Sequence, residues 1–383
     1  MPAEHLSTDF LVIGAGIAAA SIGAWLAPRG RVVLLERESQ PGYHSTGRSA
    51  ALFMESYGTP QVRALTMASR SFLEHPPDGF AEVPILSSRG VLMVGATGQD
   101  ALLEEHWQVM RSVAPDARRL SVAEALAMVP VLREERVAGG LYEPGALDID
   151  VHALHQGYLR TLRRHGGTLV CGAEVRALAR RDGVWHVDAG GAPWQAPVVV
   201  NAAGAWCDAI ARLAGVAPIG LVPKRRAAFV FAPPVGMSIA EWPAFVGVDE
   251  SWYVKPDAGM LLGSPANADP VDPHDVQPEE LDIAIAIDRI ETMTTMKIVR
   301  PARTWAGLRS FVADGDLVGG FDVDAPGFFW LAAQGGYGIQ TSAAMGEACA
   351  ALAAGEAMPP SIARFGLSGA MLSPARLRSR AAA

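Results

Sequence analysis

The sequence predicts an α/β protein with two domains, and three observations carry this prediction. A short apolar strand, a glycine turn, a helix and a second strand follow one another over residues 9–36. Two later apolar runs, at 198–204 and 327–335, also end in glycine turns. Residues 220–309 instead hold short strands, with turns between them and one helix. The first two patterns are typical of a parallel sheet covered by helices, and the third of a mostly antiparallel sheet.

The first unit has the order expected of a Rossmann-like, dinucleotide-binding βαβ motif. Gly14 and Gly16 let the backbone turn tightly and approach a pyrophosphate, whose oxygens the free N–H groups of the next helix can bind. Glu36 ends the second strand, 20 residues after Gly16, where an acid binds ribose hydroxyls. Ala19 stands at the usual third glycine position. An ordinary buried β-turn-α unit with a solvated Glu36 is the alternative. The parts are a strand over residues 10–13, a turn at 14–16, a helix over 17–26 and a strand over 31–35.

Composition excludes several function classes. The chain has 383 residues, 50% of them hydrophobic, which suffices for two domains or for one domain with a large insertion. Its 32 basic and 40 acidic residues give a net charge of −8, whereas nucleic-acid binding needs a basic face. Cys171, Cys207 and Cys349 lie far apart. We therefore expect reduced structural thiols in a cytoplasmic protein, and no metal site.

One segment could be mistaken for a membrane span or a signal sequence. Residues 10–28 contain no charged side chain. Glycines and alanines interrupt the run, and the five residues at the N-terminus lack the basic flank of a signal peptide. The βαβ motif explains the same run better, so we expect no integral membrane association.

Apolar periodicity and turn residues place the remaining elements. The helix over 60–73, for example, has apolar residues at Val62, Leu65, Met67 and Phe72. Segment 129–149 is expected to be loop-rich, and the basic tail after Ser373 to fray. Further helices are expected over 102–113, 122–128, 151–165, 206–213, 279–292 and 340–352. Further strands are expected within 82–95, 168–171, 173–178, 185–188, 198–204, 227–231, 252–255, 259–263 and 327–333.

These elements divide the chain into a Rossmann-like domain and an α+β domain built on a mostly antiparallel sheet. The first comprises residues 1–85, 145–219 and 310–383, and the second residues 86–144 and 220–309. The carboxyl ends of parallel strands open on one crevice. The glycine turns at Gly14, Gly204 and Gly335 are therefore expected to contact a single cofactor.

Three motifs make the sequence recognisable at family level. They are GYHSTGRSAA at 42–51, WAGLRS at 305–310 and AQGGYGIQTS at 333–342. With the first βαβ unit, they resemble the D-amino-acid oxidase/glycine oxidase group of FAD flavoenzymes. Within that group the chain most resembles bacterial FAD-dependent D-arginine dehydrogenase, over nearly its whole length and in the same order.

The resemblance implies non-covalent FAD and a set of cofactor contacts. The pyrophosphate would lie at Gly14, Gly16, Ile17 and Ala18. Glu36, with Arg37 beside it, would bind the adenosine ribose, and the Val175 backbone the adenine. The diphosphate and isoalloxazine would be followed by Ser45, Thr46, Gly47, Arg48, Ser49, Ala50 and Ala51. A helix N-terminus would close over the ring, and its partial positive charge would favour a reduced, anionic flavin. The residues there are Gly335, Gly336, Tyr337, Gly338, Ile339 and Gln340, and Gly307 would be a further contact.

Two arginines are candidates for a substrate carboxylate, because a guanidinium binds a carboxylate in a planar fork. Strand alternation puts Arg225 and Arg226 on opposite faces, so that one of them points inward. The resemblance selects Arg226 and Arg309. The alternative for Arg226 is a solvated strand residue, and the alternative for Arg309 is a structural ion pair.

The resemblance also assigns three further groups to the substrate. Tyr57, on a mobile stretch at 54–60, and Tyr253 match substrate-side tyrosines. The carbonyl of Gly336 matches the acceptor for the substrate amine. Ordinary loop packing is the alternative for Tyr57. His44 and His155 are interpreted as structural.

Three positions depart from D-arginine dehydrogenase, and all make the pocket more apolar. Leu52 replaces a histidine, Met54 a threonine, and Val91 the glutamate that pairs with the substrate guanidinium. A valine leaves a buried cation unpaired, which is costly. We therefore expect a D-amino-acid dehydrogenase or oxidase that prefers uncharged, hydrophobic side chains.

The expected reaction is oxidation at the carbon that bears the amine. The arginines would hold the carboxylate so that Cα–H faces the flavin, which takes the hydride from a neutral amine. The imino acid would then hydrolyse to a keto acid and ammonia, and the rate would rise with pH. The alternative within the class of flavoenzymes is an oxidase of secondary amines, acting on an N-methyl amino acid or on a glycine- or proline-like substrate. The alternative outside this class is a non-catalytic flavin electron carrier. A quinone-like acceptor or O₂ would reoxidise the flavin; no motif encodes this choice or the oligomeric state.

Overall fold

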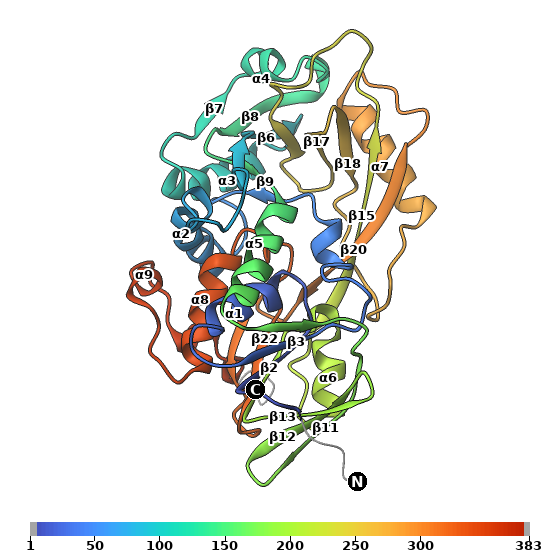
Figure 1. Ribbon diagram of the computed structural model, residues 1–383. Coiled ribbons are helices and arrows are strands. Elements are labelled where there is room, and N and C mark those ends of the chain that lie inside the picture. Colours follow the sequence, from blue (N-terminus) through green and yellow to red (C-terminus); the bar gives the residue numbers. More distant parts are fainter. Residues whose placement is uncertain (1–5, 379–383) are drawn as a thin grey trace.

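A six-stranded sheet forms the lower half of the computed structural model, which describes residues 6–378 (Figure 1). Its strand order is β10-β3-β2-β14-β22-β21, parallel except for the antiparallel edge strand β21. The parallel strands confirm the predicted Rossmann-like arrangement. The bounds are β2 Phe10–Ile13, β3 Val32–Leu35, β10 Thr168–Val170, β14 Val198–Asn201, β21 Val318–Phe321 and β22 Phe328–Ala332.

Both faces of this sheet are covered, as its uniformly apolar strands require. In β2, Phe10 and Val12 pack against a helical layer, whereas Leu11 and Ile13 pack toward a four-stranded sheet and one helix. The helical layer comprises α1 Ile17–Leu26, α2 Pro60–Glu74, α5 Val151–Arg164 and α8 Ser342–Ala353. The opposite layer comprises β1 Leu6–Ser7, β11 Val175–Arg181, β12 Val184–Ala189, β13 Ala192–Ala196 and α6 Cys207–Leu213.

A nine-stranded sheet forms the upper part of the molecule, and the long strands β15 and β20 connect it with the lower part (Figure 1). Its order is β19-β15-β18-β17-β16-β6-β8-β7, with β20 also paired to β15. Every neighbouring pair is antiparallel except β16–β6, which confirms the predicted sheet type. The bounds are β6 Val91–Ala96, β7 Arg118–Leu120, β8 Val137–Glu143, β15 Val222–Phe231, β16 Ala244–Gly247, β17 Tyr253–Asp257, β18 Met260–Ser264, β19 Asp269–Pro270 and β20 Arg303–Phe311.

Shorter elements complete the structure. A three-stranded sheet, β4-β9-β5, includes Leu52, which pairs with Asp148. These strands are β4 Leu52–Phe53, β5 Leu86–Ser88 and β9 Leu147–Ile149. The remaining helices are α3 Asp100–Val113, α4 Val122–Met128, α7 Glu280–Met293, α9 Pro360–Ala363, α10 Gly369–Leu372 and α11 Ala375–Arg378.

Two expectations were wrong. Segment 129–149 is not loop-rich, because it holds β8 and β9. The glycines of β8 suggest a turn by local propensity. A Cβ at Gly140 would lie 2.8 Å from Leu92 Cδ1, so glycine instead permits close packing of the strand there. The tail does not fray over its described part. Arg376 pairs with Asp314 at 3.0 Å and Arg378 with Asp322 at 2.6 Å. Residues 379–383 lie outside the described residues.

The domain bounds that the sequence analysis gave stay a prediction. No helix among residues 6–378 is long and apolar enough to cross a membrane. Within the same residues, no cluster of His, Cys, Asp and Glu is suited to hold a metal ion. The three cysteines are free thiols, and Cys207 and Cys349 are buried.

Candidate active site

The turn between β2 and α1 requires glycine at its first position. Gly14 has φ +107°, and a Cβ there would lie 2.7 Å from the carbonyl oxygen of Ala202. At Gly16, a Cβ would lie 3.2 Å from Thr46 Oγ1. The turn therefore presents bare backbone at the amino end of α1, as a pyrophosphate site needs.

Two buried side chains hold this turn in place. The carboxylate of Glu36 accepts hydrogen bonds from the N–H groups of Ala15, at 2.8 Å, and Glu38, at 3.0 Å. His155 Nε2 lies 2.9 Å from the carbonyl oxygen of Ala15. Burial lowers the pKa of His155, so its imidazole is neutral and Nε2 carries the donated proton. His155 is thus structural, as expected, and it positions the glycine turn.

A cavity of about 320 Å³ extends from this turn, and the three glycine turns meet in it. Gly14, Gly204 and Gly335 all line it, which confirms that they share one crevice. Trp206, which the sequence analysis did not assign, forms part of its wall, and the Arg37 guanidinium lies 4.8 Å from the ring centroid. Other predicted cofactor residues in its lining are Gly16, Ile17, Ala18, Glu36, Ser45, Thr46 and Val175.

The segment after the second βαβ strand lies between this cavity and a second one. Residues Ser45–Arg48 form a 3-10 helix. Ser45 Oγ donates to the Leu308 carbonyl at 2.6 Å, and Thr46 Oγ1 accepts from the Ile17 N–H at 3.0 Å. Arg48 is tied to an ion pair with Asp275 and to the Ala306 carbonyl. These bonds attach the segment to β20 and α1 on its two sides.

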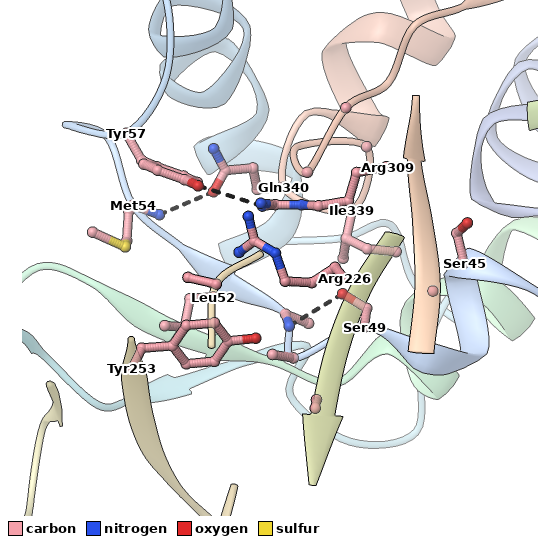
Figure 2. A pocket seen from close by; sticks show the side chains of 18 of the residues that line it. Ser45, Ser49, Leu52, Met54, Tyr57, Arg226, Tyr253, Arg309, Ile339 and Gln340 are labelled. Atoms are coloured by element: carbon pink, nitrogen blue, oxygen red, sulfur yellow. Dashed lines mark hydrogen bonds between the residues drawn. The ribbon is translucent and has the colours of Figure 1, made fainter. Parts of the chain in front are cut away.

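The second cavity measures about 240 Å³ and shares lining residues with the first, so the two form one crevice. Figure 2 shows its side chains. Gly47 and Tyr337 line neither cavity: the Gly47 N–H bonds to Gly42, and Tyr337 packs against Tyr57 and Phe311. The predicted cofactor residues in its lining are Ile17, Ser45, Thr46, Arg48, Ser49, Ala50, Ala51, Gly307, Gly335, Gly336, Gly338, Ile339 and Gln340.

Arg226 and Arg309 project into the second cavity from neighbouring strands (Figure 2). Arg225 lies on the other face of β15, where its Nε is 2.9 Å from Asp282, so the prediction from strand alternation is confirmed. Within residues 6–378, no carboxylate forms an ion pair with Arg226 or Arg309. Burial lowers the pKa of Arg226, and the like charge of Arg309 lowers it further. Two unneutralised cations therefore face the same space.

The tyrosines surround these cations. The Tyr57 hydroxyl lies 3.4 Å from Arg309 Nη2, and its ring makes an edge contact with Tyr337. Burial raises the pKa of Tyr337 to about 12, so this phenol stays neutral. Tyr253, at the start of β17, lines the opposite side of the cavity (Figure 2).

The remaining wall is apolar and includes the three positions that the sequence analysis assigned to the substrate side-chain pocket. Leu52, Met54 and Val91 all line it, and Val91 is 1% exposed. Sequence analysis did not place the rest of this wall, because β16 was not predicted and lies beside β6 through a parallel pairing. Within the described chain, Glu250 contributes the only carboxylate to the lining, and its side chain is exposed. The additional apolar residues are Met93, Ala228, Ala244, Phe245, Val246 and Ala266.

The sequence family decides what the crevice holds. The family model described as DAO, FAD dependent oxidoreductase, matches residues 9–352. The chain belongs to the DAO family of FAD-dependent oxidoreductases. FAD is therefore its cofactor, and the residues present fit it, because the bare glycine turn at the amino end of α1 lines the first cavity, which shares lining residues with the second.

Individual relatives of this DAO-family protein are distant. Glycine oxidase of Geobacillus kaustophilus is 26% identical over 268 residues, which covers 67% of this chain and 69% of that enzyme. Mitochondrial dimethylglycine dehydrogenase of Rattus norvegicus is 26% identical over 264 residues, 67% of this chain. The match spans only 30% of that longer enzyme.

Several solved structures share the fold. The crystal structure of glycine oxidase from Geobacillus kaustophilus superimposes with a TM-score of 0.81 at 22% identity, covering 94% of this chain and 98% of that one. The crystal structure of L-proline dehydrogenase from P. horikoshii gives a TM-score of 0.81 at 18% identity, covering 98% of this chain and 99% of that one. At these identities the likeness concerns the fold.

Proposed function

We propose that this enzyme oxidises D-amino acids with uncharged, hydrophobic side chains and releases a keto acid and ammonia. The observation that carries the proposal is the pair of half-buried arginines, Arg226 and Arg309, beside an apolar wall. Two cations without ion-pair partners among residues 6–378 suit a small carboxylate, because such a ligand would neutralise both charges. The wall suits a side chain without charge.

Each group of the second cavity would have one task. Arg226 and Arg309 bind the substrate carboxylate and orient Cα, which supplies orientation catalysis. The Gly336 carbonyl accepts a hydrogen bond from the amine, and Tyr57 covers the site. FAD, when bound, supplies the hydride acceptor. The amine reacts in its neutral form, so turnover rises with pH.

Three features support the hydrophobic and D preferences. Val91 is buried at the point where D-arginine dehydrogenases have their guanidinium-binding glutamate, and Leu52 and Met54 extend the apolar surface. The D configuration rests on the resemblance of the motifs at 42–51, 305–310 and 333–342 to those dehydrogenases. A dehydrogenase with a quinone-like acceptor follows from the same resemblance, with O₂ as the alternative acceptor.

A second candidate is oxidation of a secondary amine, such as an N-methyl or glycine-type amino acid. The names of two relatives favour it: dimethylglycine dehydrogenase and glycine oxidase. The same arginines would bind the carboxylate of such a substrate. The two candidates differ in what the apolar wall contacts, a side chain or an N-alkyl group.

Anaerobic bleaching of the FAD absorbance tests the proposal. Apolar D-amino acids such as D-Leu, D-Met and D-Phe should bleach the purified protein rapidly, and D-Arg and the L-enantiomers slowly. Faster bleaching by sarcosine or dimethylglycine would favour the second candidate, and no bleaching by any amino acid would contradict both. Admitting air then separates oxidase from dehydrogenase by the speed of colour recovery.

Arg226 and its neighbour provide a matched pair of variants. Arg226→Met should abolish bleaching at low substrate concentration, because the carboxylate loses one partner. Arg225→Met removes the same charge from the opposite face, where it pairs with Asp282. It should lower thermal stability and leave bleaching by D-Leu in place.

A further inference from the structure

Strand β15 loses its ladder partner on one side at the position of Arg226. On that side, Phe229–Phe231 pair with β18, and Lys224–Arg225 pair with β19. Residues 264–267, which are the last residue of β18 and the three residues after it, lie beside this gap. We call this segment the 264–267 turn.

Two side chains of this turn replace the missing ladder bonds. Ser264 Oγ donates to the carbonyl of Ala227 at 2.7 Å. The Asn267 Oδ1 atom accepts from the N–H of Ala227 at 2.9 Å. Both backbone groups of Ala227 are therefore satisfied on this side of β15 without a ladder partner.

The same turn binds Arg226 itself. Arg226 Nε donates to the backbone carbonyl of Asn267 at 2.6 Å. Its terminal nitrogens, Nη1 and Nη2, have no hydrogen-bond partner among the described residues. In Figure 2 the guanidinium points toward Tyr57 and Arg309. An arginine held at Nε presents its outer edge, with two parallel donors, to a ligand.

Internal bonds hold the turn in its own conformation. Ser264 is fully buried and also accepts the Ala266 N–H at 3.0 Å. Ala266 has φ +51° and lines the cavity. Asn267 Nδ2 donates to Asp269 at 2.7 Å, so its amide is fixed with Oδ1 toward Ala227. A non-glycine residue with positive φ persists only where the surroundings hold it.

We propose that Asn267 is a positioning residue that, with Ser264, holds Arg226 so that both terminal nitrogens face the substrate carboxylate. The inference rests on the proposed function. Asn267 acts through Arg226 and need not touch the substrate. Without its side chain, the turn loses its bond to Ala227, and the carbonyl that holds Arg226 Nε is free to shift.

The test measures carboxylate binding by the purified, FAD-loaded enzyme. Benzoate is the probe, because it combines a carboxylate with an apolar ring, and its binding is followed by the change in flavin absorbance. Asn267→Ala should weaken benzoate binding roughly tenfold, as expected for one lost positioning hydrogen bond. With a turned-over amino acid, KM should rise by a similar factor and kcat should change less, because the loss concerns binding.

A double variant provides the rescue. In Asn267→Asp/Asp269→Asn, a carboxylate oxygen at 267 accepts the Ala227 N–H, and an amide at 269 donates back, so the bonds persist and net charge is unchanged. The double variant should bind benzoate with the affinity of the wild type. Asn267→Asp alone places two carboxylates together and should bind benzoate more weakly. Asp272→Ala, which removes an exposed acid beyond β19, is the control and should leave binding unchanged.

The outcomes separate this inference from the proposed function. Wild-type benzoate affinity in Asn267→Ala, with weak binding in Arg226→Met, would overturn the inference alone. Unchanged affinity in Arg226→Met would overturn the carboxylate site and the inference with it. If Asn267→Ala does not fold, Ser264→Ala takes its place with the same expectation, and failure of the double variant to bind benzoate counts against the inference.

Discussion

The guanidinium of Arg309 lies directly against the backbone of Gly336. A Cβ at position 336 would stand 1.7 Å from Arg309 Nη2 and 2.1 Å from Cζ, closer than any side chain permits. Glycine thus allows the Arg309 guanidinium to lie here, and a side chain at 336 would displace it. The contact joins the motif at 333–342 to β20 and sets where the second cation stands in the cavity.

Gly336→Ala should therefore displace Arg309 and weaken carboxylate binding. We expect at least a tenfold increase in the benzoate dissociation constant, about 1.4 kcal/mol. Flavin difference spectra of the FAD-loaded protein measure it. Gly145→Ala is the matched control, because a Cβ there would meet its nearest atom at 3.9 Å. Equal affinity in the two variants would contradict the role assigned to this contact.

Gly14→Ala should impair FAD retention. The substitution puts a Cβ 2.7 Å from the Ala202 carbonyl and strains a backbone at φ +107°. We expect FAD affinity to fall roughly tenfold or more, as measured from the flavin content of purified protein and by titration with FAD. Ala19→Gly, at the usual third glycine position, should retain FAD. Full flavin content in Gly14→Ala would show that this turn does not approach the cofactor.

Val91→Glu should move substrate preference toward cationic side chains. The new carboxylate would be buried in the apolar wall and would need a partner, which the guanidinium of D-Arg supplies. We expect the ratio of anaerobic bleaching rates for D-Arg and D-Leu to rise about tenfold or more, with some loss of stability. Val91→Gln, of similar size and without charge, is the control. An unchanged ratio in Val91→Glu would place the substrate side chain elsewhere.

His155 should make stability depend on pH. Its folded-state pKa is lowered by burial, so between that value and the ordinary value of about 6.5 the unfolded chain binds more protons than the folded one. Its contribution to the unfolding free energy is therefore full above about pH 6.5 and declines as the pH falls below it.

The thermal unfolding midpoint, compared between wild type and His155→Gln from pH 5 to 8, measures this contribution. Glutamine keeps a donor near the Nε2 position and does not titrate. The wild type should lose more stability than the variant toward pH 5. Parallel curves over the whole range would mean that His155 keeps an ordinary pKa.

Much of the fold was predictable because its signals are local. The βαβ unit at 9–36 shows the glycines, the helix and the final acid within one short segment, and α4 has the bounds 122–128 that periodicity predicts. Arg226 could be separated from Arg225 because alternation along one strand decides which face each side chain takes.

The failures concern long-range contacts. Strand β8 contains two adjacent glycines, which by local propensity indicate a turn, and packing against Leu92 outweighs that propensity. Trp206 and Ala244 carry no local mark of a site. They line the crevice because β14 lies beside β2, and β16 beside β6, in registers that no short segment encodes.

The sequence by itself determined the α/β class, the dinucleotide turn and the identity of the two cations, since each depends on neighbours within a few residues or on a recognisable motif. Only the tertiary structure decided how those cations are presented. Arg226 is held by a residue 41 positions away in the chain, and Arg309 lies against the bare backbone of Gly336. Such contacts arise from strand pairing and close packing, which a linear sequence does not display.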